Sequence, residues 1–451
     1  MQIRKSFVLL SVGFVLAIYS FVISAQTLII ANATLIDGTG ASPIAGVNII
    51  IKGEYIDRVS GEMPEGEDIV VIDANGLTVM PGLVDMHTHP TFEVRMEKPK
   101  LPFPDPESMP SSDAEMREFI ETRLPKRLNR FLEGGITTVV SAGSYWPFEI
   151  EVRERIALEN LVGPRMLVSS PIFTATGGHP ASGICSGKRW CVKKLSFETD
   201  DANTAREGVR RYAKGGAQAI KLVYDSFDKT HIGGPNFDFP RLNKHVMTAI
   251  VDEAKGLGLP VVAHAKTVDE TADVVRAGVD ALVHSALMEN PEFTTSDGDY
   301  LPKLVQEHDL SVTTTIRSFY ERLNSAPPKA KPRMQRNFDL VGPSLRAYAD
   351  AGVTLMFGTD FDGAGLDPDP AEAVRSEARA LVAAGFSELE VISMATGNAW
   401  QHPMVPKDLG SIESGKVADL LILDKDPLQD ISAVTRPLVV IKEGRIVFDR
   451  R

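Results

Sequence analysis

The chain has 451 residues, of which 48 are Lys or Arg and 60 are Asp or Glu, so its formal net charge is −12 at pH 7. A chain of this length can form a large domain and a second, smaller unit. Because the negative charge would repel phosphates over most of the surface, no nucleic-acid partner is expected. A small-molecule substrate is the better hypothesis.

Residues 1–25 have the pattern of a secretory signal peptide. Arg4 and Lys5 precede an apolar run that ends at Ile23, and Ala25 is the expected last residue of the signal. The run is long for a signal peptide, and Ile23 is not the small residue that a cleavage site prefers, so an uncleaved membrane anchor stays open. In both cases we expect a secreted or periplasmic protein, with no stable membrane partner unless the anchor is retained.

Cys185 and Cys191 are the two cysteines of the chain. In an oxidising compartment, an even pair this close in sequence favours a disulfide that closes a short loop. The alternative is a pair of metal-binding thiolates, which would need further ligands that this stretch does not supply.

Both ends of the chain contain patterns typical of β-hairpins. Residues 26–80 and 405–451 have short β-rich runs broken by Gly, Pro and Asn. Neither end alone is expected to bury a two-sided sheet, so we predict that both combine into one small β-sandwich. Residues 81–404 are then the predicted main domain.

The main domain alternates short apolar runs with helical patterns. Continuous apolar runs suit parallel strands that are covered on both faces. Eight such strands with intervening helices predict an α/β protein with a (β/α)8 TIM barrel. The eight runs are LVDMHTH, ITTVVSAG, PRMLVSS, AQAIKLVY, PVVAHA, DALVHSA, LSVTTTI and VTLMFGTD. Pro-rich segments near 99–110 and 327–332 are expected to be loops over the barrel mouth.

Side chains that can bind a metal recur at the ends of these strands. His87 and His89 are two positions apart, so the two-residue period of a strand directs both side chains to the same face. Because the C-terminal ends of barrel strands form one rim, we expect the candidates to gather there. The candidates on later strands are Lys221, His264, His284 and Asp360.

Each candidate also has a purely structural explanation. A single strand histidine such as His264 is usually a satisfied core residue. Four histidines and one aspartate at matching strand ends are harder to attribute to packing. Lys221 lies within an apolar run, where a buried amine is costly unless it is paired or modified. Its alternative is an amine that extends to solvent at the barrel mouth.

These residues resemble the binuclear branch of the amidohydrolase superfamily. The resemblance consists of His-x-His on strand 1, Lys on strand 4, His on strands 5 and 6, and Asp on strand 8. The segments GLTVMPGLVDMHTH and GSIESGKVADLLILDKDP are similar to those enzymes as well. The segment TATGGHP, after the third strand, resembles the Gly-Gly-His of an imidazolonepropionase-like and Xaa-Pro dipeptidase-like subgroup.

The resemblance implies a site with two divalent metal ions, with zinc preferred and manganese, cobalt or iron as alternatives. The two metals would share a hydroxide that attacks the scissile carbonyl, and Asp360 would pass its proton to the leaving nitrogen. The implied ligands are His87, His89 and Asp360 for one ion, His264 and His284 for the other, and a carbamate on Lys221 as the bridge.

The substrate contacts are less defined. The resemblance makes His179 a candidate for binding the substrate carbonyl, with a structural role in its Gly-rich loop as the alternative. Where the subgroup would have a Ser-Gly-Gly type segment after the strand 4 lysine, this chain has Tyr-Asp-Ser-Phe at 224–227, which weakens any named dipeptidase activity. Tyr224 and nearby aromatic residues could hold an apolar acyl group or pack the loops together. We expect Arg317 to pair with a substrate carboxylate.

The sequence therefore predicts a secreted metal-dependent amidohydrolase that cleaves the C–N bond of a dipeptide or an N-acyl amino acid. The same binuclear site could instead act as a lactonase or a phosphotriesterase-like esterase. A mononuclear cyclic-amide hydrolase or deaminase is a further alternative, although Ala-Lys-Thr follows His264 where that class usually has Glu or Gln. A non-catalytic binding or scaffold protein would be expected to lack some of the metal ligands of the family. All of these ligands are present in this sequence, which disfavours that alternative. A homo-oligomer stays open.

Overall fold

The structure, a computed structural model, describes residues 27–63, 69–92, 109–226, 238–284, 300–362 and 369–451. The predicted signal peptide and most of the first Pro-rich segment lie outside these ranges. Within them, the named strands form three sheets.

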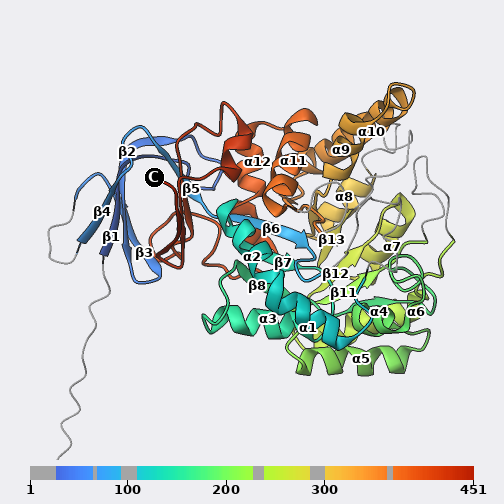
Figure 1. Ribbon diagram of the computed structural model, residues 1–451. Helices are drawn as coiled ribbons and strands as arrows, with labels where there is room; N and C mark the ends of the chain where they lie inside the picture. Colours follow the sequence, from blue (N-terminus) through green and yellow to red (C-terminus); the bar gives the residue numbers. More distant parts are fainter. Residues whose placement is uncertain (1–26, 64–68, 93–108, 227–237, 285–299, 363–368) are drawn as a thin grey trace, which may run out of the picture.

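One sheet is built from both ends of the chain (Figure 1). Its strand order is β18-β17-β16-β5-β1-β2-β3, and β4 pairs with β1. The antiparallel pairing of β16 with β5, for example Leu421 with Met80, joins the C-terminal strands to the N-terminal ones. The strands are β1 (Thr27–Leu35), β2 (Ile44–Lys52), β3 (Tyr55–Ser60), β4 (Ile69–Asp73), β5 (Thr78–Pro81), β16 (Leu420–Leu423), β17 (Val439–Lys442) and β18 (Arg445–Asp449).

The other two sheets are parallel, with orders β6-β7-β8 and β10-β9-β11-β12-β13-β14-β15. Each of the eight runs that we predicted as barrel strands contains one of these strands, and the α/β class is confirmed. Only β9 and β10 were not predicted. The strands are β6 (Leu83–Thr88), β7 (Ile136–Ser141), β8 (Arg165–Val168), β9 (Ile172–Thr174), β10 (Ser196–Glu198), β11 (Ile220–Val223), β12 (Val261–His264), β13 (Ala281–Val283), β14 (Ser311–Thr313) and β15 (Leu355–Met356).

Two isolated parallel bridges connect the two parallel sheets. Ser169, just after β8, pairs with Ala219, just before β11. Thr88 in β6 pairs with Phe361, which lies beyond β15. The ends of β6 and β15 are therefore adjacent, although they are far apart in the sequence.

Helices follow most of the parallel strands and surround them (Figure 1). No helix in the described part of the chain has the length and apolar character that a membrane span requires. The helices are α1 (Asp113–Thr122), α2 (Leu124–Glu133), α3 (Phe148–Ala157), α4 (Arg189–Leu195), α5 (Ala202–Lys214), α6 (Lys244–Gly256), α7 (Val268–Ala277), α8 (Tyr300–Glu307), α9 (Arg317–Ser325), α10 (Lys331–Asp350), α11 (Pro370–Ala383), α12 (Glu388–Met394) and the 3-10 helices η3 (Gly397–Gln401) and η4 (Ile431–Thr435).

The Pro-rich segment at 327–332 is not a long loop, which corrects the prediction. It is the short connection between α9 and α10, and Pro332 lies in the first turn of α10. Proline is tolerated there because the first amide hydrogens of a helix have no partner within the helix.

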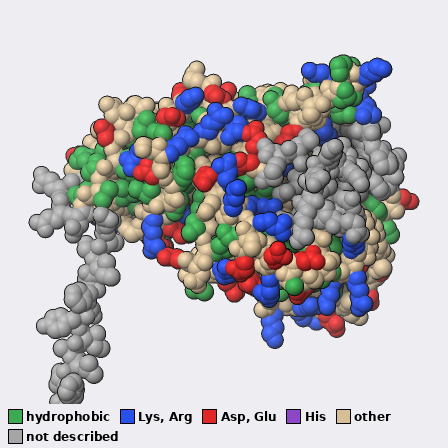
Figure 2. Space-filling model, viewed as in Figure 1, with side chains coloured by type: hydrophobic (Ala, Val, Ile, Leu, Met, Phe, Trp, Pro, Cys, Tyr) green, Lys and Arg blue, Asp and Glu red, His purple; other side chains and the backbone are tan. Residues whose placement is uncertain are grey.

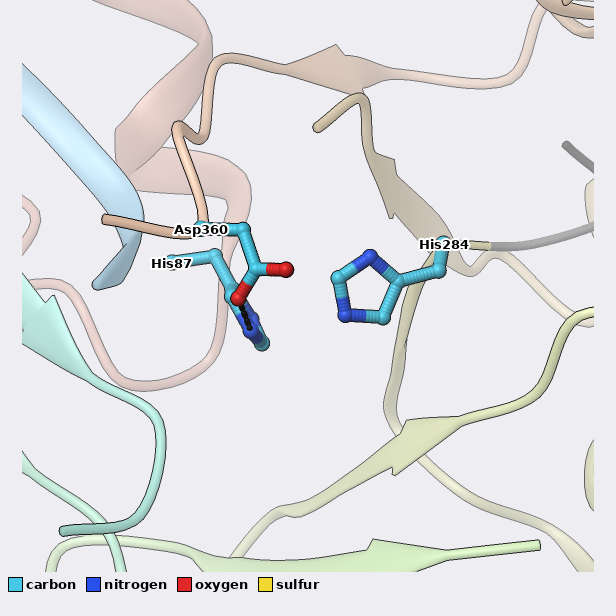
Figure 3. A group of neighbouring side chains, drawn as sticks. All are labelled: His87, His284 and Asp360. Atoms are coloured by element: carbon cyan, nitrogen blue, oxygen red, sulfur yellow. Dashed lines mark ion pairs between the residues drawn. The ribbon is translucent and has the colours of Figure 1, made fainter. Parts of the chain in front are cut away.

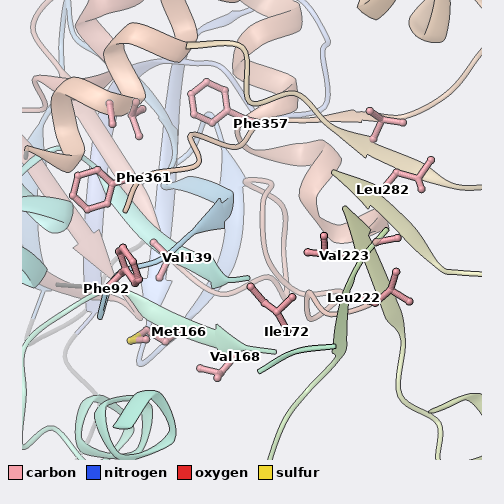
Figure 4. Close-up of a cluster of buried hydrophobic side chains, with 14 of the residues drawn as sticks. Phe92, Val139, Met166, Val168, Ile172, Leu222, Val223, Leu282, Phe357 and Phe361 are labelled. Atoms are coloured by element: carbon pink, nitrogen blue, oxygen red, sulfur yellow. The ribbon is translucent and has the colours of Figure 1, made fainter. Parts of the chain in front are cut away.

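The parallel strands are buried on both faces. Val139 in β7 packs in the large core cluster, together with residues such as Leu222 and Phe357 (Figure 4). Its neighbour Val140 belongs to a different cluster, with Met356 and other strand residues. Because successive strand residues point to opposite faces, the two clusters lie on the two sides of the strands. This explains why the strands have continuous apolar sequences.

On the face of the molecule in Figure 2, basic side chains lie among acidic ones.

Helix α12 begins with a capping box formed by Ser387 and Glu390, and Arg346 donates a hydrogen bond to Glu390 at 2.8 Å. The bond from Arg346, together with those from Ser387, lowers the pKa of Glu390 to about 2. A carboxyl whose pKa is lowered by folding contributes stability above its ordinary pKa, and this stability is lost as the pH falls toward the folded value.

We therefore expect Glu390→Gln to have a lower Tm than the wild type at pH 7, with the difference shrinking as the pH falls from about 4.5 to about 2. The effect should be modest because the Glu390 side chain is 43% exposed. Thermal melting across this pH range is the measurement. Glu388→Gln, in the same helical turn, is the control, and an equal, pH-independent loss in both variants would contradict the prediction.

Candidate metal centre

His87 and His89 converge on Asp360. Both histidines come from the end of β6, and their Nε2 atoms lie 3.2 and 3.3 Å from Oδ1 of Asp360. His87 is buried, whereas the Asp360 side chain is 47% exposed and thus open to the rim. His284 follows β13, and ligand atoms of His87, His284 and Asp360 all lie within 4.8 Å of one another (Figure 3). Three separate strand ends therefore supply one cluster of metal-binding groups.

The backbone at the site is strained. His284, Thr315 and Asp360 follow three adjacent strands and have positive φ angles of 60°, 52° and 53°. Side chains other than glycine rarely adopt this conformation, and it persists only where the surroundings enforce it. At Asp360 the enforcing bond runs from its amide to the carbonyl oxygen of His87, at 2.7 Å. This strain is a feature that the sequence pattern did not predict.

Lys221 lies in β11, within the same group of parallel strands. It is 2% exposed, and no hydrogen-bond partner for its Nζ occurs among the described residues. Burial lowers the pKa of this amine to about 7. Lys221 pairs with Val262 across β11 and β12, and two positions further along the same strands Val223 pairs with His264. The structural alternative, an amine that extends to solvent at the barrel mouth, is therefore wrong, since the amine is buried.

His264 completes the set of predicted ligands. Its ring centroid lies 4.7 Å from that of His284, which in turn lies 4.7 Å from that of His87. The five predicted side chains His87, His89, Asp360, His284 and His264 thus form a continuous series, with Lys221 on the strand beside His264.

Three of the four imidazoles have lowered pKa values, which favour the form that binds metal. Burial, followed by the charge of Lys221, lowers the pKa of His87 to about 3. Burial also lowers the pKa values of His264 and His284 well below the ordinary range. Burial alone would lower the pKa of His89 too, but the hydrogen bond with Asp360 raises it. Neutral imidazoles are the form that binds metal.

Asp360 is ionised at neutral pH. Desolvation by the surrounding residues alone would raise its pKa, but the electrostatic interaction with His284 and the hydrogen bonds from His87 and His89 hold it well below its usual range. An anionic carboxylate beside the imidazoles of His87, His264 and His284 is a donor set that suits zinc and other divalent ions. The buried amine of Lys221 also fits such a site, because a buried polar group needs a partner.

A second set of groups orients the histidine rings. Nδ1 of His89 lies 2.6 Å from the carbonyl oxygen of Gly143, and Nδ1 of His284 lies 2.7 Å from Oγ1 of Thr315. Nε2 of His264 lies 2.9 Å from Oδ2 of Asp225. Thr315 and Asp225 were not among the predicted site residues. Asp225 had a usable signal, since it lies an even number of positions after Lys221 and thus on the same side of an extended chain.

His179 lies beside this centre, on the loop after β9. Its ring centroid is 6.0 Å from that of His264 and 6.3 Å from that of Phe239. The preceding Gly178 lets the loop pack closely against Pro240, because a Cβ at position 178 would lie 2.8 Å from the carbonyl oxygen of Pro240. The position suits a contact with a substrate bound at the centre.

The disulfide between Cys185 and Cys191 is present in the structure. It closes a loop just after His179, and the amide of Cys185 donates to the carbonyl oxygen of Pro180 at 3.0 Å. The cross-link therefore restrains the segment that carries His179.

Two predicted substrate contacts are not available to a substrate, which corrects the sequence analysis. Arg317 is 8% exposed, and its guanidinium donates to the carbonyl oxygen of Thr359 at 2.6 Å and to the carboxylate of Glu321 at 3.1 Å. Tyr224 is 4% exposed, and its hydroxyl donates to Asp273 at 3.1 Å, so it faces helix α7. The ion pair between Arg317 and Glu321 was missed because Arg317 was assigned to the end of a strand, whereas it begins α9 and Glu321 lies one helical turn later.

The sequence is similar to those of known hydrolases. The model of the amidohydrolase family matches residues 78–447. Ochratoxinase of Aspergillus niger is 25% identical over 339 residues, which are 70% of this chain and 66% of that protein, so the match spans just under two thirds of its length. Imidazolonepropionase of Symbiobacterium thermophilum is 25% identical over 414 residues, 87% of this chain and 86% of that protein.

The fold is also similar to that of solved structures. A Xaa-Pro dipeptidase with methionine bound in its active site has a TM-score of 0.73 and 24% identity, and the similarity covers 94% of this chain and 100% of that one. The family generally binds metal ions. Because the family model matches most of the sequence, this chain belongs to the amidohydrolase family, a family of hydrolases.

Proposed function

We propose that the protein is a metal-dependent hydrolase that cleaves an amide or peptide C–N bond in a small substrate such as a dipeptide or an N-acyl amino acid. The observation that carries the proposal is the convergence of His87, His284 and Asp360 on one point, next to a buried lysine amine. The names of the relatives, which include a dipeptidase and imidazolonepropionase, support a C–N bond as the target.

Lys221 has the properties that a carbamate requires. Carbon dioxide reacts with a neutral amine, and burial lowers the pKa of Lys221 to about 7, so a large share of the amine is neutral near pH 7. The product would be an anion in a place where the amine itself has no hydrogen-bond partner among the described residues. Such an anion needs cations beside it, which two divalent ions, zinc by preference, would supply.

The residues of the chain would divide the chemistry among them. His87, His89 and Asp360 would hold one ion, and His264 and His284 the other. When bound, the ions lower the pKa of a water molecule and polarise the substrate carbonyl. Asp360, kept ionised by its neighbours, accepts the proton of the attacking water at Oδ and returns it to the leaving nitrogen.

We also propose that the two parallel sheets form one (β/α)8 barrel, with the eight-stranded sheet as the small β-sandwich domain. The parallel bridges Ser169–Ala219 and Thr88–Phe361 support the barrel, because the first places the end of β8 beside the start of β11 and the second connects β6 with the segment after the edge strand β15. A separate apolar cluster in the eight-stranded sheet, with members such as Ile30 and Ile422, supports a second domain.

We further propose that the protein works outside the cytoplasm, secreted or periplasmic. The signal-peptide pattern of residues 1–25 supports this location, although those residues lie outside the described ranges. The disulfide between Cys185 and Cys191 supports it too, since disulfides persist in oxidising compartments.

The test is metal analysis of the purified protein together with a substrate panel. The panel should contain dipeptides and N-acyl amino acids, each matched with a lactone, a phosphotriester and a cyclic amide. About two divalent ions per chain and selective hydrolysis of the linear amides are expected. Faster hydrolysis of the lactones or phosphotriesters would replace the proposal with the esterase alternative, and about one ion with cyclic-amide activity would replace it with the mononuclear one.

A further inference from the structure

Asp225 is a buried carboxylate that lies against the ring of His264. Its Oδ2 is 2.9 Å from Nε2 of His264, and its side chain is 0% exposed. The position follows from strand register. Val223 pairs with His264 across β11 and β12, and Asp225 comes two residues later, so it reaches His264 from the side of the strand ends.

This contact determines which nitrogen of His264 can bind a metal. A carboxylate can only accept a hydrogen bond, so Nε2 of His264 carries the proton and donates. In a neutral imidazole the other nitrogen, Nδ1, then has the lone pair. His264 is therefore held as the tautomer that presents Nδ1 to an ion.

The partner of His264 differs in charge from those of two other predicted ligands. His89 bonds to a carbonyl oxygen, that of Gly143, and His284 bonds to the hydroxyl of Thr315. A carboxylate partner makes an imidazole more basic and thus a stronger ligand than a neutral partner does. Lys266 lies 3.7 Å from the same oxygen of Asp225 and offsets part of its charge.

We propose that Asp225 is a positioning residue for the second metal ion, acting through His264. It fixes the tautomer and the orientation of the ring, and it strengthens the bond from Nδ1 to the ion. The inference rests on the proposed function, since it requires that His264 bind a metal. It also gives a role to the Tyr-Asp-Ser-Phe segment at 224–227, where the chain departs from the pattern of its subgroup.

The experiment measures zinc affinity in Asp225→Ala and Asp225→Asn by competition with a chromophoric chelator. We expect the alanine variant to bind one of two zinc ions about 10–100-fold more weakly, as is typical when such a partner is removed. The asparagine variant should lose less, because its amide oxygen still accepts a hydrogen bond from Nε2. The kcat of both variants should recover at high zinc concentration, with KM little changed.

Asp269→Asn is the control, because Asp269 is an exposed carboxylate in the first turn of α7, on the segment that follows His264. Its zinc affinity should equal that of the wild type. Thermal melting of the metal-free variants shows whether they fold. If the alanine variant does not fold, the zinc affinity of the nearly isosteric asparagine variant is compared with that of the wild type instead.

Two results would overturn the inference. An alanine variant that binds both ions within twofold of the wild-type affinity would show that Asp225 has no influence on the ion. An asparagine variant as weak as the alanine variant would show that an acceptor for Nε2 does not restore zinc affinity, so that Asp225 does not act by fixing the tautomer of His264. A wild type that binds no zinc would overturn the proposed function along with this inference, whereas an active wild type with either of the first two results would leave that function intact.

Discussion

Replacing Lys221 with alanine should remove at least one metal ion per chain and lower kcat/KM by about a thousandfold or more. The reason is that a bridging carbamate would hold both ions, and a metal pair supplies several kcal/mol of transition-state stabilisation, which corresponds to about that factor. Metal analysis and steady-state kinetics on the best substrate of the panel are the measurements. Fold stability should not fall, because the amine that is removed is buried and has no hydrogen-bond partner among the described residues.

The carbamate itself can be tested with the same variant. A small carboxylic acid such as acetate could occupy the space left by the side chain and restore part of the metal content and the activity. Lys214→Ala is the control, because Lys214 is exposed near the end of α5. One ion in both the wild type and the Lys221 variant, with activity retained, would mean that Lys221 is not a bridge and that the mononuclear alternative applies.

Replacing Arg317 with alanine should destabilise the protein and slow the reaction with every substrate. The buried guanidinium binds the carbonyl oxygen of Thr359 and the carboxylate of Glu321, and a weaker contact of 3.4 Å reaches the carbonyl oxygen of Asp360. Its removal leaves these acceptors unpaired, and breaking a buried ion pair costs about 3–5 kcal/mol of the free energy of unfolding. We expect about 3 kcal/mol in chemical denaturation, because Glu321 is partly exposed.

The kinetic pattern separates this role from substrate binding. Since Arg317 supports the strained backbone of Asp360, kcat should fall equally for N-acyl amino acids and for their neutral amides. Arg317→Lys should be intermediate, because lysine keeps the charge but not the planar set of donors. Arg336→Ala, an exposed change on α10, is the control. A stable alanine variant whose KM rises only for the carboxylate-bearing substrates would restore the original expectation that Arg317 binds a substrate carboxylate.

The strands and the metal-binding side chains were predictable because both depend on local pattern. Runs such as AQAIKLVY are apolar over both faces, and His87 and His89 follow the two-residue period of a strand. The roles of Arg317 and Tyr224 were wrong because they depend on partners more than 40 positions away in the sequence, Thr359 for the first and Asp273 for the second. The partners of the histidine rings, such as Thr315, also escaped prediction, since a threonine has no sequence signature that distinguishes it from a packing residue.

The left-handed backbone at Asp360 could not be predicted for a related reason. Nothing in GTDFDG distinguishes an aspartate with φ of 53° from one in an ordinary loop. The conformation is enforced from elsewhere: Asp85 accepts bonds from the amide and the hydroxyl of Thr359, at 3.0 and 2.6 Å. Such bonds depend on tertiary contacts that form across the sheet edge, and a sequence taken by itself contains no record of them.

The bridge between Thr88 and Phe361 has a consequence for the order in which the molecule is assembled. His87 and His89 leave the ribosome early, whereas Asp360 follows after more than half of the chain has been synthesised. The full set of ligands for the first ion therefore cannot exist while translation of the barrel region is under way. Until Asp360 has been synthesised, the nascent chain can offer the first ion only His87, His89 and the side chain of Lys221 from the proposed set. The complete site for the first ion can therefore form only after the last strand of the parallel sheets has been synthesised.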